Sequence, residues 1–427
     1  MASSSQHTRL AIDLGATSLR VCAGSPDGAV RVLFRRPTPT VRHEGLLCWD
    51  LSAILESVAE GLTAAVAELN EKPASIGCTS WAQDFVLLDE AGTLLLPPVS
   101  YREPSLLGMA ASMARQWPHA TWLPRGDISS ATRLWLLQRH FPEKLAKARH
   151  LLFMADFINH WLTGRCTVNW SLAAISGLLD AKTGDWRNDL MAAIAGNLAP
   201  QERPDAPLLV GPVSSSQVPS LLQGVPVVSG ICHDTAAAAA AVELRPDEAQ
   251  FCLGTWTMML TAEPHGDSHP LPLLPGREAH YVSLPGSWLL EQCIAKWRRE
   301  AIFSGWDEIF RSTAASACSA TFDPFHPSLA MATDDMPAAI AALCPNSTPQ
   351  TPGDFARAIT NSLTEVYAAA MHHAGRRTAV LVGGGIQNRP LVDALRSRFP
   401  VRLGPQEATA AGCILMQSRV KGFQLHG

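Results

Sequence analysis

The chain has 427 residues, of which 47% are hydrophobic and 17% are charged, and its net charge at pH 7 is −4. This length exceeds what one hydrophobic core usually supports, so we expect two domains, and the charge gives no reason to expect nucleic acid or an anionic membrane as a partner. No apolar run is long enough for a membrane span, and the polar residues 1–7 lack the apolar core of a signal peptide. The ten cysteines lack zinc-like spacing and are expected to be reduced, which favours the cytoplasm.

Strand-like and helix-like stretches alternate along the chain, which predicts an α/β fold with helices packed on sheets. We expect strands within residues 10–23, 31–34, 75–79, 225–229, 249–253 and 379–382. We expect helices within residues 51–69, 135–137, 151–162, 236–241 and 356–374, with Gly164 as a C-cap. The proline-rich stretches 264–275 and 345–352 are expected to be loops.

The first small-residue turn directly follows an apolar strand. It contains Asp13 and Gly15, and Thr17, Ser18 and Arg20 come next. Such a turn lets backbone N–H groups approach phosphates, and an aspartate at a strand tip suits water-mediated binding of Mg²⁺. An ordinary hairpin is the alternative, because a strand that ends in Asp-x-Gly is usually part of one. The segment fits neither the Walker A nor the Gly-x-Gly-x-x-Gly pattern, which makes a P-loop or a dinucleotide site less favoured.

Two later segments also run from a strand into a small-residue turn. One contains Gly254 and Thr255, and the other runs from Gly383 to Asn388. The first of these is by itself a plain hairpin. Together with the turn at residues 12–20, however, the segments suggest one nucleotide held between the two ends of the chain. The hairpins at 12–20 and 251–258 could also mark related halves.

Asp234 lies at a strand-to-helix junction, between His233 and Thr235. An aspartate there can act as a helix N-cap. It can equally accept the proton of a substrate hydroxyl as that oxygen attacks a phosphoryl group. The motif itself does not choose between these roles.

A further polar segment runs from Thr79 to Phe85 and includes Asp84, flanked by Trp81 and Phe85. A carboxylate beside an aromatic wall suits a sugar, which presents hydroxyls above an apolar ring face. The alternative is an ordinary aspartate in a surface loop. Downstream, Tyr101, Arg102 and Glu103 could line the same pocket or form an ordinary ion pair.

These segments, in this order, resemble the FGGY family of carbohydrate kinases, and within it the rhamnulokinase branch. The resemblance extends over nearly the whole chain and rests on residues 13–20, 81–89, 101–102, 151–164, 233–235, 254–256, 383–388 and 404–409. The resemblance implies ATP-dependent phosphorylation of a small ketose. The reaction of the rhamnulokinase branch, which it favours, converts L-rhamnulose to L-rhamnulose 1-phosphate. Alternatives are a kinase for L-fuculose, L-ribulose, D-xylulose or glycerol, and a catalytically weak ATP- or sugar-binding regulator.

The resemblance also implies a two-domain fold of the ribonuclease-H-like, actin-like ATPase kind around a central cleft, with domains at residues 1–238 and 239–427. It implies that Asp234 is the general base and that Asp13 organises Mg²⁺. The sugar contacts that it implies are Trp81, Ala82, Gln83, Asp84, His233, Thr235 and Ser283. The ATP contacts that it implies are Ala16, Thr17, Ser18, Leu19, Arg20, Gly254, Thr255, Glu291, Gly384, Gly385, Gln387 and Asn388. Dimerisation is expected only from the family.

Some positions depart from the rhamnulokinase pattern. Ala82 lies beside Gln83 where that branch carries a glycine, and Ser283 and Glu291 stand where it offers a sugar-binding asparagine and a nucleotide-side glutamine. A glutamate near phosphates is repulsive unless it is paired or turned towards Mg²⁺. These changes bear on the identity of the sugar, whereas the retained Asp13, Thr17, Asp234 and Thr255 argue against a regulator.

Overall fold

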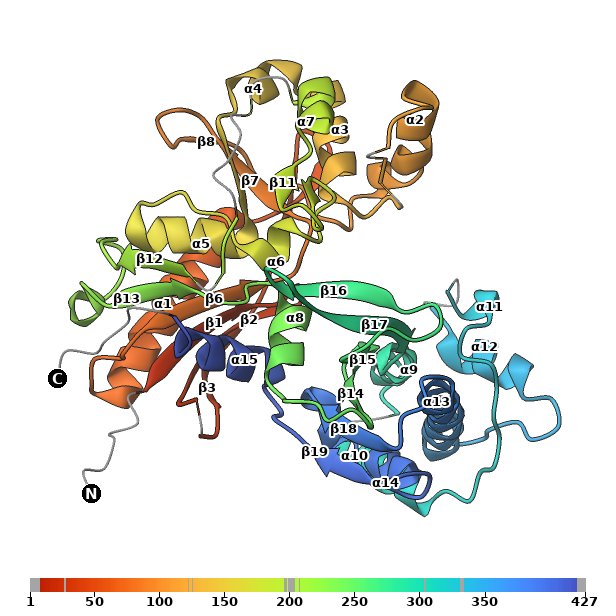
Figure 1. Cartoon of the computed structure of the whole chain (residues 1–427). Coiled ribbons are helices and arrows are strands. Elements are labelled where there is room, and N and C mark those ends of the chain that lie inside the picture. The colour runs from red at the N-terminus through yellow and green to blue at the C-terminus, as the bar shows by residue number, and fades with distance from the viewer. Residues whose placement is uncertain are drawn as a thin grey trace. The chain divides into compact units, whose positions relative to one another are not determined.

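A computed structural model describes residues 8–26, 28–121, 123–124, 126–195, 198, 204–206, 208–302, 305–330 and 334–420 (Figure 1). The polar segment 1–7 lies outside these ranges. The chain forms two compact units. The first comprises residues 1–241, 271–278 and 409–427, and the second comprises residues 242–270 and 279–408. Both combine sheets with helices, which confirms the predicted α/β class.

The first unit is built on a sheet with the strand order β12-β13-β6-β1-β2-β3. Its strands are β1 (Arg9–Leu14), β2 (Ser18–Gly24), β3 (Arg31–Pro37), β6 (Ile76–Ser80), β12 (Leu208–Pro212) and β13 (Pro226–Ser229). The first two strands form an antiparallel hairpin, whereas β6 runs parallel to both β1 and β13. The carboxyl ends of β1, β6 and β13 therefore lie at one edge of this sheet.

Smaller sheets and most helices complete the first unit. The other strands are β4 (Thr40–His43), β5 (Leu46–Trp49), β7 (Phe85–Leu88), β8 (Leu94–Leu96), β9 (His150–Phe153), β10 (Leu179–Asp180) and β11 (Asp185–Trp186). The α-helices are α1 (Leu51–Leu69), α2 (Met109–Gln116), α3 (Ser130–His140), α4 (Pro142–Lys147), α5 (Met154–Thr163), α6 (Trp170–Ala173), α7 (Asn188–Ile194), α8 (Asp234–Ala240) and α15 (Ala408–Gln417). Short 3₁₀ helices occur at η1 (Pro104–Leu106) and η2 (Ser220–Leu222).

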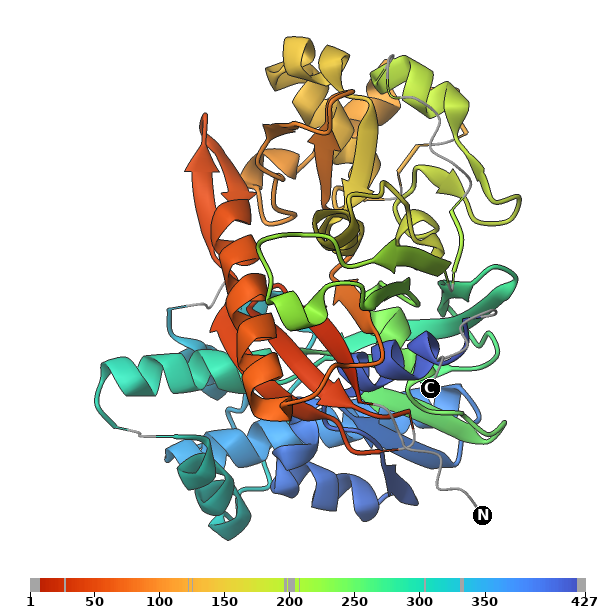
Figure 2. The same cartoon turned by 90° about the vertical axis from the view of Figure 1, so that its left-hand side faces the viewer.

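Helix α1 has the bounds predicted from its apolar periodicity. It begins after Asp50, whose carboxylate accepts the N–H of Ala53, and it ends at Leu69, followed by the C-cap Asn70 with a left-handed φ of 52°. Buried Ile54 and Val58 lie four residues apart and therefore share one face of the helix. This helix packs against β2 and β3, as Figure 2 shows in orange and red.

The C-terminal helix α15 belongs to the first unit, although the division expected from the sequence placed all residues after 238 in the second domain. The amide of Gln417 donates to the carbonyl of Leu10 and accepts from the hydroxyl of Ser75, so it bridges β1 to the start of β6. A Cβ on Gly412 would clash with the carbonyl oxygen of Ala237. The alanine-rich α8 and Gly412 thus permit a close helix approach within this unit.

The second unit contains a sheet with neighbouring strands in the order β17-β15-β14-β18-β19. These strands are β14 (Glu248–Cys252), β15 (Trp256–Thr261), β17 (Arg277–Pro285), β18 (Thr378–Val382) and β19 (Val401–Leu403). Its helices are α9 (Trp288–Arg299), α10 (Trp306–Ala315), α11 (Pro327–Ala330), α12 (Met336–Leu343), α13 (Pro352–His373), α14 (Arg389–Arg396) and the 3₁₀ helix η3 (Gly384–Gln387). Within this unit an antiparallel hairpin is again followed by a parallel strand. This pattern matches β3-β2-β1-β6-β13, in agreement with two related halves.

Two local predictions are wrong. Residues 151–153, expected in a helix, belong to β9, because the sheet formed with β7 pairs Phe85 with Phe153. The stretch 264–275, expected to be a loop, contains the strand β16 (His269–Leu274). Strand pairing decided both cases, and local periodicity does not reveal a pairing partner. Among the described residues, no helix has the length and apolarity needed to cross a membrane.

Candidate active site

The polar motifs of the first unit meet at the carboxyl ends of its parallel strands. Asp13 lies near the end of β1, and Trp81 follows the end of β6. The turn after β13 is bound to β6, since the N–H of Ser80 donates to the carbonyl of Cys232 at 2.8 Å. Asp234 then begins α8. Ligands in open α/β sheets commonly bind at this edge, so it is the candidate site in this unit.

The hairpin between β1 and β2 holds an ion pair. Asp13 is 1% exposed, and its Oδ2 lies 2.5 Å from Nη2 of Arg20, the residue opposite it in the hairpin. Its Oδ1 accepts a long hydrogen bond of 3.4 Å from the hydroxyl of Thr79. The turn is tight, because the N–H of Gly15 donates to the carbonyl of Ser18. A buried carboxylate and a part-exposed guanidinium thus lie at the base of the small-residue turn.

Asp234 is the first residue of α8, and His233 occupies the N-cap position. The Oδ1 atom of Asp234 accepts from the N–H of Thr235 at 2.6 Å and from its hydroxyl at 3.2 Å. The side chain is 31% exposed, and burial raises its pKa to about 6 despite these bonds and the charge of Arg20. The carboxylate is therefore mostly ionised at pH 7 but can accept a proton readily.

His233 lies beside this carboxylate, with Nε2 3.5 Å from Oδ1 of Asp234. Burial lowers the pKa of His233 to about 4. The imidazole is therefore neutral at pH 7 and does not hold Asp234 in a salt bridge. This leaves the carboxylate available to act as a base.

Asp84 is fully buried, unlike the surface aspartate considered from the sequence. Its Oδ2 accepts from the indoles of Trp49 and Trp81 at 2.6 and 2.8 Å and from the N–H of Tyr101 at 3.1 Å. Its Oδ1 lies 2.7 Å from Nε of the equally buried Arg133. Asp84 therefore fixes an aromatic wall, in which the rings of Trp49 and Trp81 are 4.3 Å apart.

Gln83 adopts a left-handed backbone with φ of 79°, which is unusual for a residue with a side chain. Its amide donates to the carbonyl of Ile175 and accepts the N–H of Ser130, and its carbonyl accepts the hydroxyl of Ser130. The loop containing Ala82 and Gln83 is thus held rigidly in a strained conformation. Strain of this kind is concentrated at functional sites.

In the second unit, Thr255 lies in the turn between β14 and β15, and its hydroxyl is bonded to Glu291. The hydroxyl donates to Oε1 and Oε2 of Glu291 at 3.1 and 3.3 Å. Ser287 donates to the same carboxylate at 2.6 Å. Both hydroxyl protons therefore point at Glu291, which is paired with neutral donors. An exposed Trp256 stacks on Trp288 next to this group.

The glycine turn after β18 packs on the same hairpin. Gly383 has a φ of 88°, and a Cβ there would lie 2.7 Å from the carbonyl oxygen of Leu253. The N–H of Gly385 donates to that carbonyl at 3.0 Å. Asn388 caps α14 by accepting the N–H of Leu391. The second unit therefore brings its two small-residue turns together.

The remaining predicted contacts differ in exposure. Leu19 is a core residue, so only its backbone can face a ligand, whereas Thr17, Ser283, Gly384 and Gln387 are exposed. Ala16, Ser18 and Gly254 lie in or beside the two hairpin turns. Within the described ranges, no group of three or more His, Cys, Asp or Glu side chains is placed to hold a metal ion.

Comparison with protein families shows that the two parts of the chain, taken in sequence order, match known domains. Residues 8–241 match the N-terminal domain of the FGGY family of carbohydrate kinases, and residues 249–420 match its C-terminal domain. The chain belongs to the FGGY family of carbohydrate kinases. It is therefore a sugar phosphotransferase, and ATP is the phosphoryl donor that the family implies.

Curated relatives of this FGGY kinase include rhamnulokinases. One from Halalkalibacterium halodurans is 25% identical over 442 residues, which cover 96% of this chain and 92% of that protein. One from Yersinia pestis is 30% identical over 438 residues, which cover 95% of this chain and 88% of that protein. These relatives match nearly the whole chain.

Solved structures share the fold of this FGGY kinase. A glycerol kinase from Plasmodium falciparum with ADP has a TM-score of 0.73 at 15% identity, with 97% of this chain and 90% of that chain covered. A xylulose kinase from Rhodospirillum rubrum has a TM-score of 0.69 at 20% identity, with 98% and 92% covered. At these identities the likeness concerns the fold alone.

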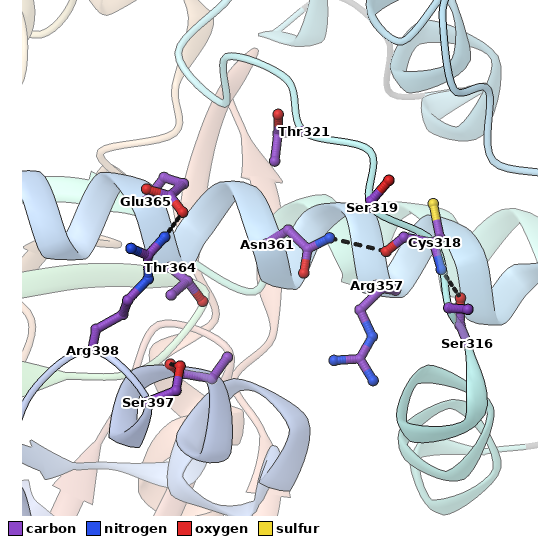
Figure 3. Close-up of a pocket in the computed structure, with 12 residues that line it drawn as sticks. Ser316, Cys318, Ser319, Thr321, Arg357, Asn361, Thr364, Glu365, Ser397 and Arg398 are labelled. Carbon is purple, nitrogen blue, oxygen red and sulfur yellow. Dashed lines mark hydrogen bonds and ion pairs between the residues drawn. The ribbon is translucent and has the colours of Figure 1, made fainter.

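A separate groove of about 470 Å³ lies in the second unit of the FGGY kinase, between α13, α14 and residues 316–321 (Figure 3). Arg398 pairs with Glu365 there, and the amide of Asn361 donates to the carbonyl of Cys318. None of the residues that line this groove belongs to the predicted contacts. The groove therefore lies apart from the predicted sugar and ATP contacts in residue content.

Sequence analysis missed several residues that hold the predicted contact residues of this FGGY kinase within each unit. Arg133 and Trp49 hold Asp84, Ser287 holds Glu291, and Asn169 and Ser171 hold the turn before Asp234. The only local signal is an asparagine before a short helix, which is typical of an N-cap. The other partners are distant in sequence and carry no motif.

Proposed function

We propose that this FGGY kinase phosphorylates L-rhamnulose, or a closely similar ketose, on its primary hydroxyl. The rhamnulokinase relatives support the substrate class, because the matches extend over 95–96% of the chain. The observation that carries the proposal is the part-exposed carboxylate of Asp234 at the start of α8, with a pKa of about 6. A base with a pKa near the working pH is well suited to proton abstraction.

In the proposed reaction, the sugar hydroxyl oxygen attacks the γ-phosphorus of ATP. A new P–O bond forms, the bond to the β–γ bridging oxygen breaks, and ADP leaves. Asp234 accepts the hydroxyl proton as this oxygen becomes bonded to phosphorus, and it later releases the proton to water. His233 and Thr235 flank the carboxylate and would contact the sugar, His233 as a neutral imidazole.

We propose that the sugar ring lies against the wall formed by Trp81 and its neighbours. Asp84 would act by fixing this wall, since all its buried oxygens are engaged within the protein. The rigid loop at Ala82 and Gln83 would shape the pocket. Ser283 would be a further sugar contact, as the resemblance implies, and it is exposed on β17.

For ATP, we propose that residues Ala16 to Arg20 and the turn at Gly254 and Thr255 contact the phosphates. Backbone N–H groups of small-residue turns and a part-exposed guanidinium both suit phosphate oxygens. Gly384, Gly385, Gln387 and Asn388 would contact the adenosine. Glu291 would orient the hydroxyl of Thr255, which donates to its carboxylate, rather than contact phosphate directly.

We propose that Mg²⁺ enters with ATP and that Asp13 is its protein carboxylate. The donor set fits, because Mg²⁺ is usually held by one or two carboxylates together with phosphates and several waters. The carboxylate of Asp13 is buried and faces the guanidinium of Arg20. When bound, Mg²⁺ would neutralise charge that develops on the transferred phosphoryl group.

The proposal is tested by measuring sugar-dependent release of ADP by the purified protein with ATP and Mg²⁺. The panel contains L-rhamnulose, L-fuculose, L-ribulose, D-xylulose and glycerol. We expect the highest kcat/KM with L-rhamnulose. A higher kcat/KM with another member would overturn the proposed substrate while leaving the family assignment intact.

A further inference from the structure

The short turn Gly230–His233 joins β13 to α8 and delivers Asp234 to the candidate site. His233, the last residue of this turn, is the N-cap residue of α8, but its imidazole makes no capping hydrogen bond. The turn is held instead by the start of α6, where Asn169 and Ser171 are fully buried. We propose that Asn169 and Ser171 are positioning residues that place the carboxylate of Asp234. This inference rests on the proposed function of Asp234 as the base.

Ser171 uses its complete hydrogen-bonding capacity on this turn. Its hydroxyl proton is donated to Oδ1 of Asn169 at 2.6 Å. Its two lone pairs then accept the N–H groups of Cys232 and His233, each at 3.0 Å. A serine hydroxyl has one donor and two acceptor positions, so all three are occupied. The second of these N–H groups lies one peptide unit before Asp234.

Asn169 fixes both Ser171 and the beginning of the turn. Its amide nitrogen donates to the carbonyl of Gly230 at 2.7 Å and to the hydroxyl of Ser229 at 2.9 Å. Its backbone N–H donates to Oδ1 of buried Asp156 at 3.1 Å. The turn is therefore tied at its first residue by Asn169 and at its last residue by Ser171.

This arrangement does more than cap α6. An ordinary N-cap requires only the bond from the N–H of Ser171 to Oδ1 of Asn169 at 2.9 Å. Apart from the bond between the Ser171 hydroxyl and Oδ1 of Asn169, the other bonds of the two side chains go to residues 229–233, about 60 positions along the chain. Loss of these bonds would let the turn shift. A general base displaced from hydrogen-bonding reach of its proton loses efficiency.

The test compares Ser171→Ala with the wild-type protein, using the preferred sugar of the panel. We expect kcat to fall at least tenfold while the KM for ATP changes less than threefold. We also expect the apparent pKa of the acid limb in the plot of kcat against pH to differ from the value of about 6 expected for the wild-type protein. Ser171→Cys keeps a similar shape with a weaker acceptor and should recover part of kcat. It also serves as the test variant if Ser171→Ala does not fold.

Ser362→Ala is the matched control. Ser362 is also buried, donates to a helix carbonyl and accepts the N–H of Phe322, but it lies in the second unit. The Ser362→Ala substitution should lower thermal stability without changing the apparent pKa of the acid limb of kcat. An equal change in the control would assign the Ser171 effect to general destabilisation and overturn the inference.

Asp234→Asn, measured alone and combined with Ser171→Ala, separates this inference from the proposed function. If Ser171 acts through Asp234, then Ser171→Ala has little further effect on kcat in the Asp234→Asn background. Full activity of Asp234→Asn would refute the proposed base itself. An inactive Asp234→Asn together with an unchanged kcat and pH limb in Ser171→Ala would refute the positioning role alone.

Discussion

Replacing Asp234 by Asn removes the proposed base while keeping an oxygen that can accept the N–H and hydroxyl of Thr235. General-base catalysis typically contributes about 10²–10⁴-fold, so we expect sugar-dependent kcat to fall by about that factor. Binding of ATP should be retained. In the wild-type protein, a base with a pKa of about 6 should make kcat fall about tenfold per pH unit below that value, because only the ionised carboxylate accepts a proton.

The same substitution should stabilise the protein at pH 7. Folding raises the pKa of this carboxyl from 3.8 to about 6, so the folded state binds the proton more tightly and stability falls as pH rises through that window. At about 1.4 kcal/mol per pKa unit, and allowing for partial exposure, the ionised group costs about 1–3 kcal/mol. Asn carries no charge and should recover this amount.

The assay is coupled ADP release from pH 5 to 8, together with urea unfolding at pH 5 and pH 7. Asp335→Asn is a matched control, since Asp335 also lies at a helix start and accepts a backbone N–H, that of Ala338. It should leave kcat unchanged. A kcat within threefold of wild type in Asp234→Asn would refute the assignment of the base.

Three further perturbations test other parts of the structure. Glu291→Gln removes the negative charge that lies beside the hydroxyl of Thr255. Because this charge would repel the ATP phosphates, the variant should bind Mg²⁺-free ATP about fivefold more tightly, or by about 1 kcal/mol, as measured by calorimetry with EDTA. An unchanged Kd would remove Glu291 from the phosphate region. Gly412→Ala forces a Cβ against the carbonyl of Ala237 and should lower the free energy of unfolding by about 1–3 kcal/mol in urea, and a neutral result would contradict the close helix packing. Arg133→Met leaves a buried carboxylate at Asp84 unpaired and should cost about 3–5 kcal/mol in the same assay. Adding Asp84→Asn to Arg133→Met should restore much of that loss, and a loss undiminished in the double variant would show that charge is not its cause.

Much of the fold follows from local signals in the sequence. The bounds of α1 follow from its apolar spacing, and the hairpins around Gly15 and Gly254 follow from strands that run into small-residue turns. The position of Asp234 at a strand-to-helix junction was equally visible. These features depend on residues close together in the chain, so their physical causes are local backbone preference and periodic burial.

Other features were decided only when distant segments met. Residues 151–153 became a strand because β7 supplies hydrogen-bonding partners, and α15 joined the first unit because Gln417 bonds to Leu10 and Ser75. The same holds for individual side chains. The sequence left Asp84 either beside an aromatic wall or in a surface loop, and its indole and guanidinium partners show that it is buried.

The sequence by itself therefore determined which residue types stand at the strand ends, and with them the family and its kind of chemistry. The tertiary structure determined how these residues are held and charged. Burial raises the pKa of Asp234 to about 6 and lowers that of His233 to about 4. Asn169 and Ser171 bond to a turn about 60 residues away. Desolvation and long-range hydrogen bonds arise only when the chain is folded, because both depend on neighbours that are not adjacent in sequence.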